Sequence, residues 1–200
     1  MNFIEKLRSR ELRVMCVPAA LHGIMKENIS LWMAIYIVDV YSVNLKSSAY
    51  YILLIPVIGF AARMVYPMLL RFFKGNENAV SQIFFVVCAC VSLLVCFSQI
   101  GMMFSVIALG VIYAAVSIIN TSMLSIYPLR YTNEGSCAGV SGILDFATYF
   151  GAGVSSAIYG VVIKHFGYLP MFVSWLVISL FSAIILHIIS KRRDEIETFC

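Results

Sequence analysis

The chain has 200 residues, of which 62% are hydrophobic and 12% are charged, and its mean hydropathy is +0.94. Soluble domains carry roughly 25% charged residues, so this composition leaves too little polar surface for a water-soluble globule and predicts a protein embedded in lipid. The net charge of +4 does not point to nucleic acid, because the basic residues lie between apolar runs instead of forming a groove-binding stripe.

Polar residues divide the chain into six apolar runs, each long enough to cross about 30 Å of hydrocarbon as a helix. The runs cover roughly residues 14–39, 48–70, 79–97, 102–126, 138–162 and 168–190. The sequence therefore predicts an all-α membrane protein, with a six-helix transmembrane bundle over 14–190. A basic segment at 1–13 precedes the bundle, and a tail at 191–200 follows it.

The basic residues are divided unevenly between the two sides that six spans would define. One side keeps only Lys46 and Lys164, whereas the other holds Lys6, Arg8, Arg10, Arg13, Arg71, Lys74, Arg130, Lys191, Arg192 and Arg193. Cytoplasmic loops of membrane proteins are enriched in Lys and Arg. We therefore expect both termini to be cytoplasmic, in a multi-pass protein of the cell (inner) membrane of a prokaryote.

The first run contains two charges near its middle, Lys26 and Glu27. A charge at the bilayer centre costs at least about 2.5–3.5 kcal/mol and normally faces a bundle interior or a water-filled cavity. His22, Lys26 and Ser30 are four residues apart and share one helix face, whereas Glu27 is expected not to face Lys26 on its own helix. Lys26 is then either the structural partner of a Glu27 from elsewhere or a contact for an anionic solute, since a compact ammonium suits phosphate or carboxylate.

Two further charges lie inside predicted spans, Arg63 in the second and Asp145 in the fifth. Each is some eight to ten residues from the predicted cytoplasmic end of its span, which at 1.5 Å per residue is roughly 12–15 Å deep. The matching depth and opposite charge predict an ion pair between the two helices that acts as a structural or gating latch.

The fourth run carries a polar stripe at helical spacing, with Tyr113, Ser117, Asn120 and Thr121 on one side. Such a stripe either holds helices together by hydrogen bonds or lines a cavity, and both interpretations stay open. Tyr113, Asn120 and Thr121 are the candidate lining residues. The fifth run is rich in small residues, and two sets have the spacing that lets helix backbones approach closely in lipid: Gly153 with Ala157, and Ala152 with Ser156 and Gly160.

Three stretches of the chain together carry a resemblance to a known family: HGIMKENISLWMAIYI from His22 to Ile37, FFKGN from Phe72 to Asn76, and the block that begins PLRYTNEGSCAGVSGILDF at Pro128. With these, the chain resembles the C-terminal six-helix half of a major facilitator superfamily transporter. The likeness is greatest to the organophosphate:phosphate antiporters, which carry glycerol 3-phosphate and hexose phosphates. It covers essentially the whole chain.

The resemblance implies secondary active transport of a small, anionic, organophosphate- or sugar-like solute by alternating access. Lys26 stands where those carriers have an arginine that holds the substrate phosphate, so it is implied as the anion contact; a lysine lacks the bidentate geometry of arginine, which widens the candidates to carboxylates and sugars. A second six-helix half, from a separate chain or a homodimer, is implied as the partner. Residues 1–13 would then be a cytoplasmic linker remnant.

Two alternatives to a carrier follow from the same sequence. The chain could be a non-transporting membrane scaffold or an inactive truncated remnant. More remotely, the Gly139–Gly142 stretch and a histidine on the next span, His187, invite comparison with intramembrane serine proteases, with Ser141 as the nucleophile. The six cysteines have no metal-ligand spacing, so we expect neither a metal nor an organic cofactor, and we do not expect an enzyme.

Overall fold

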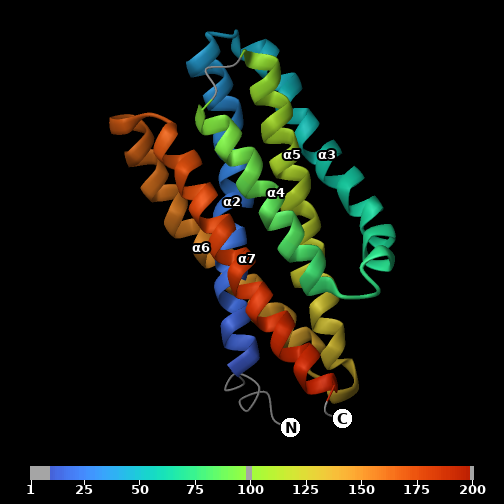
Figure 1. Ribbon diagram of the computed structural model, residues 1–200. Coiled ribbons are helices and arrows are strands. Elements are labelled where there is room, and N and C mark those ends of the chain that lie inside the picture. Colours follow the sequence, from blue (N-terminus) through green and yellow to red (C-terminus); the bar gives the residue numbers. More distant parts are fainter. Residues whose placement is uncertain (1–9, 98–100, 199–200) are drawn as a thin grey trace.

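The computed structural model describes residues 10–97 and 101–198, and these residues form a bundle of long helices (Figure 1). The elements, in chain order, are α2 (Arg10–Tyr41), α3 (Leu45–Phe72), α4 (Glu77–Phe97), α5 (Met102–Asn120), the π segment η1 (Thr121–Ile126), the 3₁₀ segment η2 (Tyr127–Glu134), α6 (Cys137–Phe166) and α7 (Leu169–Thr198). The start of α2 and the end of α7 lie at the same end of the bundle. The predicted helical membrane bundle is thus confirmed, with six long helices in the described part of the chain.

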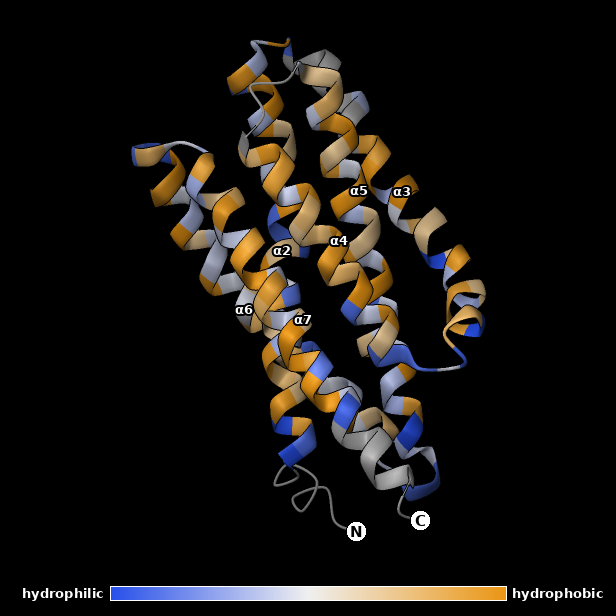
Figure 2. Ribbon diagram, in the orientation of Figure 1, coloured by the Kyte–Doolittle hydropathy of each residue, from blue (hydrophilic) through white to orange (hydrophobic). Residues whose placement is uncertain are grey.

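Five of the six helices are long and apolar enough to cross a membrane: those that contain Leu53–Phe72, Glu77–Cys96, Met102–Glu134, Cys137–Phe166 and Leu169–Lys191. The first predicted span, 14–39, corresponds to α2, which has the length but is not among the five. Its middle is polar because Lys26, Glu27 and Asn28 follow one another there. Figure 2 shows this hydropathy pattern, with apolar residues predominating along the other helices.

The fourth predicted span, 102–126, is not one continuous α-helix. The α-helical winding ends at Asn120, and the next six residues form the π segment η1 before η2 begins at Tyr127. In η1 the carbonyl of Leu124 accepts a hydrogen bond from Ser141 Oγ at 3.1 Å, and Pro128 lacks the N–H that a continuing helix would need. The winding therefore changes where side chains of other helices replace the regular backbone ladder.

The helices pack most extensively as α4 with α7 and α2 with α6, followed by α4 with α5 and α3 with α5. These contacts repeat when α2 is exchanged for α5, α3 for α6 and α4 for α7. Under that exchange the pair α2–α6 corresponds to α5–α3, and the pair α4–α5 corresponds to α7–α2. The pair α4–α7 corresponds to itself. All of these pairs are in contact. Because each set of three crosses the bundle three times, the second set starts at the opposite end (Figure 1). The two sets of three helices thus run in opposite directions and share most, though not all, of their contact pattern, since α2–α3 has no comparable counterpart in α5–α6.

Helices α2 and α6 cross at a very short distance. A Cβ added to Gly23 would lie 2.0 Å from the carbonyl oxygen of Thr148, and one added to Gly151 would lie 2.4 Å from that of Ala20. Thr148 Oγ1 also donates to the carbonyl of Ala19 at 3.2 Å. Close approach through small residues is predicted for the fifth run. Ser156 and Gly160 of that prediction do lie against α2, next to Asn28 and Trp32, whereas Gly153 is exposed with nothing near its Cβ position.

Candidate functional site

The charges inside the long helices are confined to one part of the bundle. Within α4 beyond Glu77, α5, and α7 as far as Ser190, no residue carries a formal charge. The charges belong to α2, with Lys26 and Glu27, to α3, with Arg63, and to α6, with Asp145. Helices α4 and α7 lie in front of α2 in Figure 1, so the uncharged α4–α7 pair suits lipid and the α2 side needs a polar environment.

Lys26 and Glu27 form an ion pair on α2, with Lys26 Nζ 3.0 Å from Glu27 Oε1. The expectation that Glu27 would not face Lys26 on its own helix is therefore wrong. Adjacent side chains leave the helix in different directions, but the long stems of Lys and Glu bend toward each other at its surface. The pair is partly open, with 14% of the Lys26 side chain and 35% of the Glu27 side chain exposed.

An aromatic ring from α6 completes the surroundings of Lys26. The ammonium lies 5.7 Å from the centroid of the Tyr149 ring, within the range of a cation–π contact. Tyr149 is itself 58% exposed. We define Lys26, Glu27 and Tyr149 as the Lys26 site: a cation held by one carboxylate and one ring, on a flank of the bundle that stays accessible.

The other two residues of the predicted face, His22 and Ser30, lie in different surroundings. Ser30 is exposed and donates to the carbonyl of Lys26 at 3.3 Å, so it lies beside the Lys26 site. His22 is fully buried, and its Nε2 donates to the carbonyl of Val116 on α5 at 3.0 Å. In this structure His22 therefore joins α2 to α5 and does not border the accessible surface around Lys26.

The polar residues of α5 lie at its contact with α3 and at the start of η1. Tyr113 is buried, and its ring lies where a side chain on Gly59 would project, with Cε1 2.9 Å from a built Cβ. Thr121 Oγ1 donates to the carbonyl of Ser117 at 3.1 Å. Asn120 Oδ1 is buried and has no hydrogen-bond partner among the described residues. Tyr113 thus packs against a neighbouring helix, while the side-chain oxygen of Asn120 accepts no hydrogen bond from the described residues.

A polar seam that sequence reasoning missed joins α2 to α6 next to the Lys26 site. The amide nitrogen of Asn28, which is buried, donates to Ser155 Oγ at 2.8 Å and to the carbonyl of Ile24 at 2.7 Å. Its carbonyl oxygen accepts from Ser156 Oγ at 3.3 Å and from Trp32 Nε1 at 3.2 Å. The available signal was an asparagine in an apolar run, whose amide tends to find hydrogen-bond partners on a neighbouring helix in lipid.

The predicted gating pair is not formed within the chain. Arg63 and Asp145 are both exposed, they belong to helices on opposite sides of α2 (Figure 1), and no ion pair joins them in the described structure. Depth along a helix was readable from the sequence, but the direction in which each helix lies from its neighbours was not. The two charges are therefore placed at separate edges of the bundle.

The residues of the protease comparison also have other partners. Ser141 Oγ donates to the carbonyl of Leu124 in η1, and Gln82 Nε2 on α4 lies 3.3 Å from His187 Nδ1. No hydrogen bond connects Ser141 with His187 in the part of the chain that the structure describes. The arrangement does not present a serine activated by this histidine.

A second charged cluster lies at the end of the bundle that holds both termini. Arg130 of η2 contacts the carboxylate of Glu77 at the start of α4, and its Nη1 lies 3.6 Å from Glu11 Oε1 on α2. Tyr127 donates to the same Glu11 oxygen at 3.1 Å, and the guanidinium lies 5.0 Å from the Tyr127 ring centroid. We call these residues the Arg130 cluster; it fastens three segments together and was not predicted.

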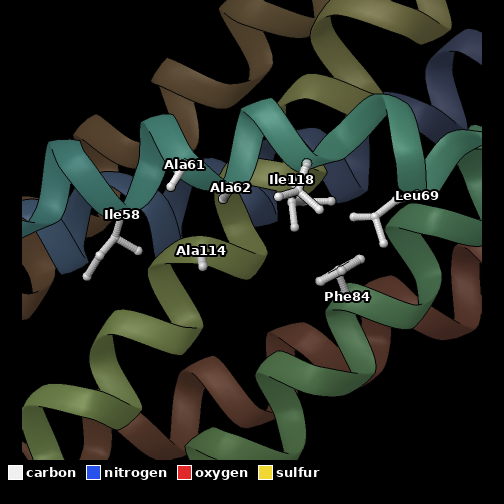
Figure 3. Close-up of a pocket in the computed structure, with 8 residues that line it drawn as sticks. Ile58, Ala61, Ala62, Leu69, Phe84, Ala114 and Ile118 are labelled. Atoms are coloured by element: carbon white, nitrogen blue, oxygen red, sulfur yellow. The ribbon is translucent and has the colours of Figure 1, made fainter.

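The cavity drawn in Figure 3 lies between α3, α4 and α5 and has a volume of about 390 Å³. It is lined only by carbon-rich side chains: Ile58, Ala61, Ala62, Val65, Leu69, Phe84, Ala114 and Ile118. Such a lining offers no hydrogen bond or charge to an anion. This cavity therefore does not suit a polar ligand.

Within residues 10–97 and 101–198, no group of three or more His, Cys, Asp or Glu side chains comes together as a metal site would require. Comparison with known proteins adds no assignment to this geometry: no protein-family model and no curated protein matches the chain.

Proposed function

We propose that the chain is one half of a secondary carrier that moves a small anionic solute across a prokaryotic cell membrane by alternating access. The observation that carries the proposal is the position of Lys26, a cation at the middle of α2 that packs among helices long and apolar enough to cross a membrane and whose side chain remains 14% exposed. Ionisable residues in such positions commonly mark the path of a solute or ion.

The inverted arrangement of the two three-helix units supports the same function. Many secondary transporters are built from inverted repeats, and each six-helix half of a major facilitator carrier contains two such three-helix repeats. The exchange of α2–α6 with α5–α3 has this form. In such carriers the solute lies between two halves near the bilayer midplane, which is where a second half would cover the Lys26 site.

The chemistry of the Lys26 site favours an anion that competes with Glu27. The ammonium of Lys26 is neutralised by the Glu27 carboxylate, with Nζ 3.0 Å from Oε1. A phosphate or carboxylate solute would displace that partner while the Tyr149 ring stays near the cation, and Ser30 supplies a neighbouring hydroxyl. Organophosphates, dicarboxylates and acidic sugars are the solute classes that this cation could hold.

The test is uptake by the full chain, reconstituted with any protein that co-purifies with it, using labelled phosphate, glycerol 3-phosphate and a dicarboxylate. We expect Lys26→Gln to weaken the apparent affinity roughly 10- to 150-fold, the worth of a hydrogen bond to a charged group. Glu27→Gln is expected to strengthen it about 2- to 5-fold, because a partly exposed competing ion pair is removed. The opposite signs separate an anion contact from a structural pair.

Lys164→Gln is the matched control, since this lysine is exposed in the last turn of α6 and its loss should leave uptake unchanged. Equal loss of stability in both variants of the pair, with no shift in affinity, would make Lys26 a structural partner of Glu27. Absence of uptake by the wild-type protein for all three probes would favour the scaffold alternative.

A further inference from the structure

Arg63 and Asp145 form no ion pair among the residues that the structure describes. Each side chain is exposed two or more turns inside a helix that is long and apolar enough to span a membrane, and an uncompensated charge at the bilayer centre costs at least about 2.5–3.5 kcal/mol. Lipid tails cannot compensate either charge. Something polar or oppositely charged therefore covers both positions in the membrane.

The direction of Arg63 follows from the faces of α3. The buried stripe of this helix contains Ala62 and Tyr66, and the side toward α4 is marked by Ile58 and Val65, which line the cavity with Phe84 of α4 (Figure 3). At 100° per residue, Arg63 lies on the other flank of the buried stripe from Ile58 and Val65. Arg63 therefore projects away from α4, on the α2 side of the bundle.

The direction of Asp145 follows from Tyr149. The two residues are four apart on α6 and share a face, and Tyr149 lies against Lys26 of α2. Asp145 therefore also lies on the α2 side. We call this surface the charged face. Arg63 lies at its α3 edge, Lys26 and Glu27 lie near its middle, and Asp145 lies at its α6 edge.

The charged face is complementary to itself. It carries two cations and two anions, with the unpaired cation at one edge and the unpaired anion at the other. Arg63 is about nine residues before the end of α3 at Phe72, and Asp145 is about eight residues after the start of α6 at Cys137. Each therefore lies roughly 12–14 Å from the end of its helix that points toward the chain termini (Figure 1). A two-fold axis along the membrane normal keeps depth and brings the α3 edge of one copy opposite the α6 edge of the other.

We propose that the charged face is the interface between two parallel copies of this chain, in which Arg63 of each copy pairs with Asp145 of the other. Each charge is then compensated by one partner, the two-fold symmetry forms this contact twice, and the Lys26 sites of the two copies face each other across the axis. This inference deepens the proposed function, because it identifies the second half of the carrier as a second copy.

The test uses two full-length copies with different affinity tags, co-expressed and extracted gently. Arg63→Asp paired with itself, and Asp145→Arg paired with itself, each place like charges across the interface, and we expect co-purification to fall at least about tenfold. When one copy carries Arg63→Asp and the other Asp145→Arg, both contacts are again between opposite charges. Co-purification should then return to near the wild-type level.

Rescue by mixing is specific to pairing between copies, because neither single variant carries a compensating change in its own chain. Lys164→Glu, a charge reversal on the same helix as Asp145 but outside the charged face, is the control and should co-purify normally. A mixture no better than the single variants would overturn the pairing. So would a wild-type complex in which native mass spectrometry finds only one 22.3 kDa chain, alone or with a different protein.

These outcomes are distinguishable from failure of the proposed function. A complex with a different membrane protein that takes up the anion probes would overturn the homodimer and leave the carrier standing. Rescue by mixing, in a dimer that takes up none of the probes, would establish the interface and remove the transport proposal.

Discussion

Replacing Arg130 with methionine should lower the free energy of unfolding by about 3–5 kcal/mol, the largest effect that we expect from a single change. The substitution leaves the Glu77 carboxylate, whose side chain is 6% exposed, without the cation that contacts it. Removing one partner of a buried ion pair costs this much because the remaining charge stays desolvated and uncompensated. The loss can be measured by denaturant unfolding in detergent, with tryptophan fluorescence as the signal.

The double variant Arg130→Met with Glu77→Gln is the matched control. It removes both charges from the Arg130 cluster, and replacing both members of a buried pair is often nearly neutral, so we expect most of the lost stability to return. Arg71→Met, at an exposed position in the last turn of α3, should change little. A double variant as unstable as Arg130→Met alone would show that the guanidinium contributes through Glu11 or Tyr127 instead.

Substituting alanine for Gly23 should be nearly as damaging, at roughly 1–3 kcal/mol or more. The new methyl group would sit 2.0 Å from the carbonyl oxygen of Thr148 and 2.7 Å from its carbonyl carbon. Both atoms belong to the backbone, so no side chain can move aside and α2 must shift from α6. That shift would also lengthen the hydrogen bonds of the Asn28 seam.

Gly153→Ala provides the comparison, because a Cβ at this exposed position of α6 meets nothing within 4 Å. Alanine is favoured over glycine inside helices by about 0.8–1.0 kcal/mol, so this change should leave the midpoint of thermal unfolding unchanged or raise it. Gly151→Ala should behave like Gly23→Ala. Equal effects at Gly151 and Gly153 would contradict the close crossing seen here.

The helical bundle could be predicted because length and hydropathy are local properties. Apolar runs separated by polar residues marked all six long helices, even where α2 is interrupted by Lys26 and Glu27. The change of winding at Thr121 could not be predicted in the same way. It depends on Ser141 reaching Leu124 and on Ser122 donating to the Glu77 carbonyl, which are contacts between segments far apart in the chain.

The residues of the candidate site could be predicted from the sequence, but the direction in which each side chain points could not. Lys26 was found because a charge inside an apolar run is conspicuous. Spacing by four placed His22 and Lys26 on one side, yet neighbouring helices divide that side, so that His22 meets α5 while Lys26 meets α6. Arg63 and Asp145 show the same limit, since matching depth carries no information about lateral position.

The seam between α2 and α6 has a consequence for how the protein is made. Helix α2 leaves the ribosome before α6, but the buried amide of Asn28 donates to Ser155, which follows 127 positions later in the chain. Until α6 is synthesised, α2 must enter the bilayer with an ion pair and an amide that lipid cannot solvate. Helix α2 therefore depends on the insertion machinery until α6 follows, and a nascent chain stopped before α6 should be retained there or degraded.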